Sequence, residues 1–368
     1  MAKQSDLFEF LQGQGAVYVE TEGWLLPRTF DSTEAEYRAV RGAVGLIDMP
    51  HRHLLQFTGA DRVSFLQGML SNDVRALQMF ERQHAAILTQ QGKMIAEVRV
   101  LCALNSIYLD FWEPRKETIL AHLNRYLVAD EVEITDPSEN WHMLSVQGPR
   151  TGELLAKLFN AGPLPSNPAH HGMIQFDGSP ICVVRANHFD EAGYDLIVAK
   201  SALAKLAQRL TEIDEEFSAA WIGEEVLEIL RVEAGVPRHG VDYTEDNLLL
   251  EIDLKDAVSF TKGCYLGQEV VERIRSRGHV NKRLSGLLLD GDDPARSGAP
   301  LLAGGKEAGK ITSSVRSPAL RKPIALGYVQ KDFWASGTEL TVADPRGARR
   351  ATVSDLPFVS GSTAAVSS

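Results

Sequence analysis

The chain has 368 residues, of which 44% are hydrophobic and 24% are charged, as in soluble globular proteins. This length is too great for one ordinary hydrophobic core and predicts two or three domains. The 49 acidic residues outnumber the 38 basic ones and give a formal net charge of −11. Such a balance argues against a broad nucleic-acid-binding surface. No apolar run approaches the roughly 18 residues of a membrane-spanning helix, so a membrane is not expected as a partner either.

The first 140 residues predict an α+β unit. Apolar residues at helical spacing indicate helices over 34–41, 63–70 and 115–127, and alternating or apolar runs indicate strands over 54–57, 85–89, 94–104, 107–112 and 132–135. Some segments of this part are expected to pack on the following unit. We expect its strands to form an antiparallel sheet backed by the helices.

Residues 141–282 repeat this order of elements. Strands are predicted over 142–146, 180–186 and 194–198, and helices over 148–159, 202–210 and 224–233. Ser201 is a plausible N-cap of the second of these helices, and Gly235 and Pro237 would end the third. The similar order in the two parts predicts a weak internal duplication of α+β units.

The pattern changes near Arg283. Short predicted strands over 284–289, 309–315, 324–330, 339–342 and 351–353 are separated by turns rich in Gly, Pro and Asp. We therefore predict a small all-β barrel or sandwich over 283–360. The last residues, 361–368, are small and polar and are expected to form a flexible tail.

The three cysteines do not indicate a disulfide framework or a zinc site, because their number is odd and none belongs to a CxxC pair. Cys102 and Cys182 lie in apolar runs and are expected in the core. The N-terminus lacks the basic-then-apolar pattern of a signal peptide, so we expect a cytoplasmic protein. The absence of a clear exposed apolar seam favours a monomer.

The third cysteine, Cys264, lies in the stretch Lys262-Gly263-Cys264-Tyr265-Leu266-Gly267-Gln268-Glu269. A helix is predicted to begin near Gly267, so its free N–H groups would point back towards the thiol. A helix N-terminus and a neighbouring lysine both favour thiolate over thiol. A reactive or recognition thiol is one interpretation, and a buried cysteine that acts as a small hydrophobe is the other.

Other site patterns are weak. The basic run of Arg273, Arg275, Arg277, Lys282 and Arg283 could hold an anionic ligand, although such runs are more often solvated faces. The histidine pairs at 51 and 53 and at 170 and 171 have no acidic or cysteine partner at a convincing spacing, so no metal site is predicted. No phosphate-binding glycine loop and no GxSxG elbow is present.

The cysteine stretch, with the following Arg277-Gly278-His279-Val280-Asn281-Lys282-Arg283-Leu284, closely resembles the signature of the YgfZ-type folate-binding proteins. These are relatives of the glycine-cleavage T-protein, a tetrahydrofolate-dependent aminomethyltransferase. Segments around 41–48, 65–74, 190–195 and 230–235 are similar to those of the broader superfamily. The resemblance implies a three-domain ring around a folate-sized pocket, and a role for Cys264 as the functional residue.

The resemblance also implies which residues contact folate. At two places this chain departs from the pattern of the transferase. Asp195 corresponds to a pterin-binding glutamate, and the other candidates lie in or near matched segments: Glu191, Asn72, Tyr265, Gln268 and Arg231. For Arg231, a structural ion pair and a ligand contact are both open. Where the transferase has an aspartate pair after a glycine turn, this chain has Ala96 and Glu97. Leu227 stands where the transferase uses an arginine.

Three functions follow as hypotheses. The first is a tetrahydrofolate-binding protein that acts through Cys264 in iron–sulfur cluster assembly or repair and so influences cluster enzymes, including those that modify tRNA. Its partners would be folate (tetrahydrofolate or a one-carbon derivative) and iron–sulfur proteins or assembly factors. The second is a folate-dependent aminomethyl- or methyltransferase, against which Ala96 weighs. The third is a folate-sensing scaffold without chemistry.

Overall fold

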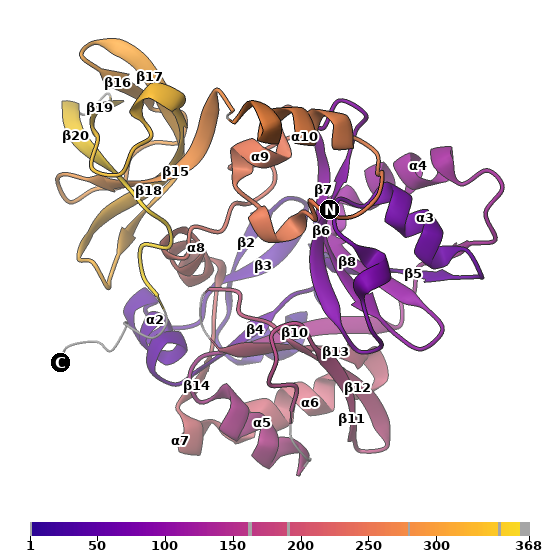
Figure 1. The fold of residues 1–368 in the computed structure, drawn as a ribbon. Helices are drawn as coiled ribbons and strands as arrows, with labels where there is room; N and C mark the ends of the chain where they lie inside the picture. The colour runs from indigo at the N-terminus through magenta and orange to yellow at the C-terminus, as the bar shows by residue number, and fades with distance from the viewer. Residues whose placement is uncertain (1, 161–163, 190–191, 279, 345–346, 361–368) are drawn as a thin grey trace. The chain divides into compact units, whose positions relative to one another are not determined.

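The computed structural model describes residues 2–160, 164–189, 192–278, 280–344 and 347–360. The chain forms two compact units (Figure 1). The first unit consists of Met1–Ile87 and Ala96–Leu227, and the second of Leu88–Ile95 and Glu228–Ser368. Among the described residues, no helix has both the length and the apolar character needed to cross a membrane.

A six-stranded sheet is the base of the first unit, with strand order β11-β12-β13-β10-β4-β14. All its neighbouring strands are antiparallel except β4 and β14, which are parallel. The strands are β4 (Val44–Asp48), β10 (Trp141–Gln147), β11 (His171–Phe176), β12 (Ser179–Arg185), β13 (Gly193–Ala199) and β14 (Ala219–Trp221). The parallel pair corrects the prediction of purely antiparallel sheets.

One face of this sheet packs on helices, as Figure 1 shows. The helices are α5 (Thr151–Phe159), α6 (Lys200–Glu212) and α7 (Asp214–Phe217). Alternate strand residues such as Leu144, Val146 and Leu196 point into a core shared with Leu155 and Leu206, as the two-residue period of a strand requires. The residues between them, including Ser145 and Asp195, therefore point to the opposite face.

A five-stranded sheet, in the order β6-β7-β8-β5-β9, is predominantly in the first unit. Its strands are β5 (Arg52–Thr58), β6 (Arg82–Leu88), β7 (Met94–Cys102), β8 (Ile107–Trp112) and β9 (Glu133–Thr135). The chain between them forms α3 (Arg62–Met69), η1 (Val74–Ala76), η2 (Glu113–Arg115) and α4 (Lys116–Tyr126). Leu54 and Leu101 of this sheet pack on Met143, Val184 and Ile197 of the six-stranded sheet. The two sheets thus face each other through the surfaces that carry Ser145 and Asp195.

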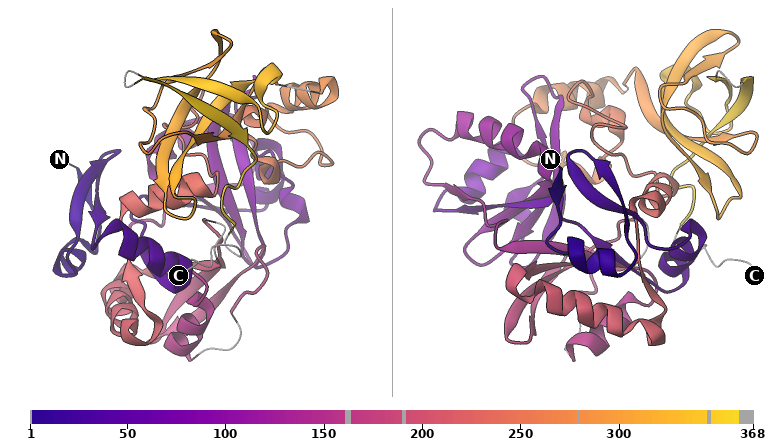
Figure 2. Two further views of the ribbon diagram at one scale, coloured as in Figure 1. Left: turned by 90° about the vertical axis from the view of Figure 1, so that its left-hand side faces the viewer. Right: turned by 180° about the vertical axis from the view of Figure 1, so that it is seen from behind.

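The N-terminal residues form a small sheet that the sequence patterns did not predict. Its order is β1-β3-β2, with β1 (Lys3–Gln4), β2 (Val17–Thr21) and β3 (Trp24–Thr29), and Figure 2 shows it from behind in indigo. The helices α1 (Phe8–Gly13) and α2 (Thr33–Gly42) follow β1 and β3. Leu7 and Leu11 enter the core beneath the six-stranded sheet, which anchors this segment.

His142 holds the N-terminal segment electrostatically. The buried imidazole contacts Asp48 through Nε2, at 2.6 Å, and Asp6 through Nδ1, at 3.2 Å. Lys200 approaches the same Asp6 carboxylate to 3.0 Å. Burial, together with the charge of Asp48, raises the pKa of Tyr18 to about 12. Burial by itself lowers the pKa of His142, but the two carboxylates outweigh it and raise the pKa to about 9.

This raised pKa predicts a stability that depends on pH. The contribution of His142 is fully present below the unfolded-state pKa of about 6.5 and is lost as the pH rises through about 9. Its size is roughly 3 kcal/mol. Urea unfolding of wild type and His142→Gln between pH 6 and 9.5 should show a difference in unfolding free energy that shrinks with rising pH. A difference that stays constant over this range would contradict the interpretation.

The second unit contains a closed six-stranded barrel in the order β15-β18-β17-β16-β19-β20. Its strands are β15 (Lys282–Leu289), β16 (Pro300–Ala303), β17 (Lys306–Ser317), β18 (Lys322–Gln330), β19 (Glu339–Asp344) and β20 (Gly347–Ser354), with η4 (Lys331–Phe333) between β18 and β19. Leucines, valines and alanines of the inner face fill the barrel. The prediction of a barrel or sandwich is therefore resolved in favour of a barrel.

Short helices precede the barrel: α8 (Glu224–Glu233), which begins in the first unit, α9 (Leu249–Ile252), η3 (Lys255–Ala257) and α10 (Gln268–Arg277). Helix α10 begins directly after Gly267, which confirms the predicted helix start. The predicted N-cap at Ser201 is wrong, because α6 already begins at Lys200 and its N-cap position is Ala199. The α+β architecture with a C-terminal barrel is confirmed.

Candidate functional site

Two cross-strand pairs place charged and polar side chains between the sheets of the first unit. Ser145 on β10 lies directly opposite Asp195 on β13, and Arg99 on β7 lies directly opposite Asp110 on β8. Side chains at directly opposed positions of an antiparallel pair are close neighbours on one face. All four are buried. The register of two separate strand pairs thus brings a charged cluster together inside an otherwise apolar interior.

Asp195 is fully buried and bonded from three sides. Ser145 Oγ donates to Oδ1 at 2.6 Å, Arg99 Nη1 donates to Oδ2 at 2.5 Å, and His188 Nε2 lies 2.9 and 3.0 Å from the two oxygens. Burial by itself raises the pKa of Asp195. The charges of His188 and Arg99 and the hydrogen bonds outweigh that effect and hold the pKa well below its usual range.

Arg99 bridges two carboxylates. Its Nε donates to Asp110 Oδ2 at 2.7 Å, and its guanidinium forms ion pairs with both Asp110 and Asp195. Arg52 adds a second positive charge on Asp110, with Nε 2.8 Å from Oδ1. Burial alone would lower the pKa of Arg99, but the two carboxylates raise it further above its ordinary value. Arg99 therefore stays charged.

Two histidines and one glutamate form the accessible side of this cluster. The side chain of His188 is 28% exposed and that of Glu97 is 30% exposed. His84 Nδ1 lies 3.2 Å from Glu97 Oε1. Burial raises the pKa of Glu97, but the hydrogen bond and charge of His84, with the charges of Arg52 and His188, outweigh it and lower the pKa. Buried charges held in fixed positions lie next to accessible side chains that can gain or lose a proton. This arrangement suits acid–base chemistry.

Ala96 and Glu97, which stand where the transferase has its aspartate pair, lie on β7, the strand that also carries Arg99. Ala96 is almost completely buried, whereas Glu97 is on the face of β7 that also carries Arg99. The alternation of a strand therefore puts the carboxylate at 97, not the methyl group at 96, next to the charged cluster. Position 96 supplies no proton-transfer group.

Asp195, which the resemblance implies as a pterin contact, is bonded by residues of the protein itself. A carboxylate offers about four acceptor positions, and three donors bond it here: Ser145, Arg99 and the Nε2–H of His188, which lies near both oxygens. Because the side chain of Asp195 is also completely buried, neither of its oxygens is exposed to the amino edge of a pterin. Asn72 belongs to the neighbourhood of Glu97, since its Nδ2 donates to the backbone oxygen of His84 at 2.8 Å. Glu191 lies outside the described residues.

The remaining predicted residues belong to the second unit. Cys264 is a free, exposed thiol four residues before the first residue of α10. Tyr265 is buried, its hydroxyl has no hydrogen-bond partner among the described residues, and burial raises its pKa to about 12. The ammonium of Lys262 lies 5.0 Å from the centre of the Tyr265 ring. Gln268, the first residue of α10, is half-buried.

Arg231 is fully occupied by internal partners. It bonds Glu228 through Nε and Nη2, Asp242 and the backbone oxygen of Val236 through Nη1, and Ser313 through Nη2. These contacts use all five N–H groups of a guanidinium. No donor remains for a ligand, so of the two alternatives the structure favours the structural ion pair.

Two glycines fix the loop of Cys264. Gly267 has a φ of +87°, and a Cβ there would lie 2.6 Å from the backbone oxygen of Thr89. Gly92 has a φ of +71°, and a Cβ there would lie 2.8 Å from Val270 in the first turn of α10. The absence of side chains at both positions lets the turn between β6 and β7 contact the start of α10. The thiol is thus carried on a loop with a defined support.

We expect Gly267→Ala to disrupt this support, because the substitution combines a positive φ with a backbone clash. The loss should exceed about 1 kcal/mol of unfolding free energy, with a changed rate of Cys264 modification by a thiol reagent. Gly263→Ala is the matched control, since that position has an ordinary φ and open space around the glycine. Equal stability and equal thiol reactivity of the two variants would contradict the prediction.

The histidine pairs from the sequence serve local contacts. His53 Nε2 lies 2.9 Å from Asp136, and His171 Nε2 lies 3.0 Å from the backbone oxygen of Cys102. Burial lowers the pKa of His171 to about 4. Within the described ranges, no three His, Cys, Asp or Glu side chains are grouped so that they could hold a metal ion.

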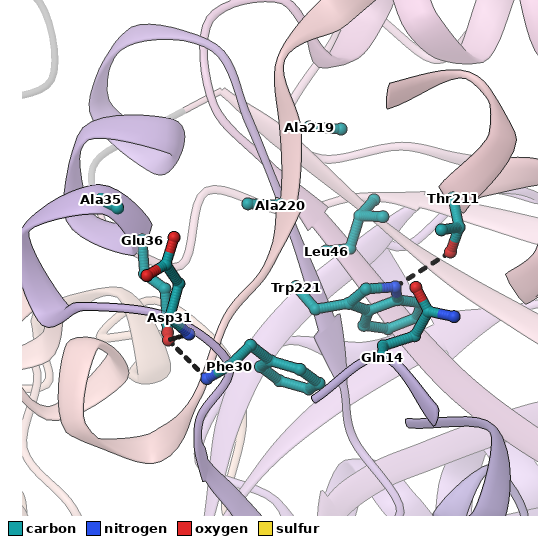
Figure 3. A pocket seen from close by; sticks show the side chains of 10 residues that line it. All are labelled: Gln14, Phe30, Asp31, Ala35, Glu36, Leu46, Thr211, Ala219, Ala220 and Trp221. Atoms are coloured by element: carbon teal, nitrogen blue, oxygen red, sulfur yellow. Dashed lines mark hydrogen bonds between the residues drawn. The ribbon is translucent and has the colours of Figure 1, made fainter. Parts of the chain in front are cut away.

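A cavity of about 320 Å³ lies elsewhere in the first unit and is shown in Figure 3. Trp221 Nε1 donates to Thr211 Oγ1 at 3.0 Å, and Glu36 accepts hydrogen bonds from the backbone N–H groups of Phe30, Asp31 and Gly223. The described residues that line it include no histidine, cysteine or lysine. These polar contacts explain the local structure, and we place the functional site at the cluster around Asp195 instead.

Comparisons with known proteins agree over the length of the chain. Residues 7–262 match the family described as GCVT N-terminal domain, and residues 282–360 match the Glycine cleavage T-protein C-terminal barrel domain. The chain is 32% identical to an aminomethyltransferase of Rubrobacter xylanophilus, over 97% of this chain and 94% of that protein. It is 30% identical to an aminomethyltransferase of Shouchella clausii, over 96% of this chain and 97% of that protein.

The fold agrees with a solved structure as well. The glycine cleavage system aminomethyltransferase T from Bartonella henselae matches with a TM-score of 0.90 and 23% identity, over 98% of this chain and 99% of that chain. The match covers the α+β part and the barrel together. From the two domain matches and the aminomethyltransferase relatives, we conclude that this chain belongs to the glycine cleavage T-protein family.

Proposed function

We propose that the protein is a folate-dependent one-carbon transferase of the aminomethyltransferase type. The observation that carries the proposal is an accessible Glu97 beside His188, above the buried pairs of Arg99 with Asp110 and Asp195. Relatives named aminomethyltransferase, matched over nearly their whole length, support the same chemistry. Tetrahydrofolate would supply the nitrogen atoms that accept the one-carbon group.

Glu97 is the residue that fits the amino edge of a pterin. Its Oε1 contacts His84, while no described residue bonds Oε2. An ionised carboxylate only accepts hydrogen bonds, and the 2-amino and N3–H groups of a pterin are donors. The lowered pKa keeps Glu97 ionised at neutral pH. In this proposal the accessible Glu97, and not the completely buried Asp195, recognises the pterin.

Calorimetric titration with tetrahydrofolate tests the recognition step. We expect wild type to bind and Glu97→Gln to bind at least tenfold more weakly, because the amide loses the charge and one acceptor position. Glu133→Gln, the same change at an exposed glutamate of the first unit, should bind like wild type. Absence of binding by wild type, or equal binding by Glu97→Gln, would remove the proposed pterin contact.

A second candidate function rests on Cys264. The thiol is exposed on the loop before α10, and the buried Ala96 stands where the transferase has an acid. The resemblance of the stretch around Cys264 to YgfZ-type proteins supports a folate-binding protein that maintains iron–sulfur clusters, with iron–sulfur proteins as partners. In this alternative Cys264 carries out the chemistry, and the bound folate either regulates the protein or supplies a one-carbon group.

Turnover separates the two candidates. The transferase should convert tetrahydrofolate to the methylene form with an aminomethyl donor, and Cys264→Ala should keep that activity. In the alternative, wild type binds tetrahydrofolate without turnover, and Cys264→Ala fails to restore the activity of cluster-dependent tRNA-modifying enzymes in a deletion strain. Restoration by Cys264→Ala would exclude the thiol role.

A further inference from the structure

We propose that His188 is the proton-transfer residue of this site, taking the place of the acid that Ala96 cannot provide. The inference rests on the proposed transferase function and deepens it. The sequence patterns did not single out His188. The loop between β12 and β13 places His188 next to the buried carboxylate of Asp195.

The orientation of the imidazole follows from its partner. His188 Nε2 lies 2.9 and 3.0 Å from the two oxygens of Asp195. Because Asp195 is ionised and can only accept hydrogen bonds, Nε2 must carry the hydrogen. Fixing one nitrogen by a carboxylate sets the tautomer and the ring orientation, as in Asp–His pairs of hydrolases. In the neutral imidazole the free base is therefore Nδ1.

Nδ1 of His188 is available for a ligand. No described residue forms a hydrogen bond with it, and it is not among the buried side-chain nitrogens that lack a partner. The side chain is 28% exposed. The charged groups that interact with the ring are Asp195 from β13 and Glu97 from β7, and Arg99 of β7 bonds the same Asp195. An accessible nitrogen over an anchored ring is the geometry that a general base requires.

The support of His188 extends into the buried interior. Its backbone N–H donates to Gln147 Oε1 at 3.4 Å, and Gln147 Nε2 donates to Ser145 Oγ at 2.9 Å and to the backbone oxygen of Ala186 at 3.3 Å. Ser145 in turn donates to Asp195. The main chain and the side chain of His188 are thus fixed by one connected hydrogen-bond network, which limits the reorganisation needed during proton transfer.

The proton balance of the transfer gives His188 a defined task. When a folate nitrogen forms its bond to the one-carbon group, that nitrogen loses its proton, and the electron pair of the N–H bond stays on nitrogen. The lone pair of His188 Nδ1 takes the proton, and the resulting imidazolium is stabilised by Asp195. The same proton then passes to the departing amine as its bond to carbon breaks. No oxidant or reductant is required.

Nitrogen-15 NMR of the full chain, labelled at histidine, tests the tautomer without requiring activity. The signals of His188 are identified by their loss in His188→Gln. We expect a protonated Nε2 and an unprotonated Nδ1 when the ring is neutral. A neutral ring protonated at Nδ1 would overturn the proposal.

Kinetics test the role itself. His188→Gln should lower kcat by about 10²- to 10⁴-fold, remove the acidic limb of the pH–rate profile, and leave tetrahydrofolate affinity within about twofold. Added imidazole should restore part of the rate. His170→Gln, at an exposed histidine of the same unit, should match wild type. Inactive wild type would refute the proposed function, whereas active wild type with an equally active His188→Gln refutes only the role of His188.

Discussion

Asp242→Asn is expected to lower the free energy of unfolding by about 3–5 kcal/mol, the usual cost of removing one partner from a buried ion pair. The side chain of Asp242 is completely buried. Its Oδ2 accepts from Arg231 Nη1 at 2.5 Å and from the backbone N–H of Arg238 at 2.9 Å, and its Oδ1 accepts from Thr312 and Ser313 at 2.5 and 2.8 Å.

Asparagine has the same shape but replaces one acceptor oxygen with a donor. Whichever way the amide is oriented, two of the four donors would face an NH₂ group, and the buried charge of Arg231 would lose a carboxylate. Since Thr312 and Ser313 belong to the barrel strand β17, the substitution should loosen the helical segment of the second unit from its barrel. Urea or thermal unfolding measures the loss.

The control is Asp246→Asn, four residues away in the same unit. Its side chain is 92% exposed and forms only a surface ion pair with Lys93, at 3.2 Å. Exposed pairs of this kind contribute about 0–1 kcal/mol, so we expect little change in the unfolding midpoint. Two variants of equal stability would contradict the role assigned to Asp242.

Arg99→Met is the second substitution with a large expected effect, about 3–5 kcal/mol at neutral pH. Methionine fills much of the same volume but leaves the buried carboxylate of Asp195 with only Ser145 and the partly exposed His188. Asp110 keeps Arg52. We therefore expect both a loss of stability and a displaced His188, measurable as a changed histidine signal by NMR.

The loss should depend on pH in a defined direction. The depressed pKa of Asp195 means that its ionised form stabilises the wild type above the unfolded-state pKa of about 3.9, and this stability is lost on acidification. Arg99→Met removes part of this stabilisation by ionised Asp195 already at neutral pH. The difference between variant and wild type should therefore shrink as the pH falls below about 4.

Arg209→Met is the control for this prediction. Arg209 lies on the outer side of α6 and pairs with Glu212 one turn away, at 3.1 Å, with 56% of its side chain exposed. Pairs of this spacing contribute about 0.2–0.5 kcal/mol. If Arg99→Met were as mild as Arg209→Met at pH 7, the buried charge cluster would not hold the two sheets together.

The sequence by itself determined the class of fold and most of its helices and strands, but not the small N-terminal sheet. Alternation of apolar residues gave β7 and the barrel strands, and the glycine before Gln268 gave the start of α10. One signal of the site was also local: Glu97 and Arg99 are charged residues at alternate positions of an otherwise apolar strand. Such patterns are readable because the periods of helices and strands are properties of neighbouring residues.

Only the tertiary structure decided which of those residues meet. Arg99 and Asp195 are separated by 96 positions, and His188 reaches Asp195 from a loop with no pattern of its own. Their encounter depends on the register of β10 with β13 and on how two sheets face each other, and a shift of one residue would turn each side chain away. Because these contacts join residues far apart in the sequence, neither the charged cluster nor the burial of Asp195 within it could be derived from the sequence alone.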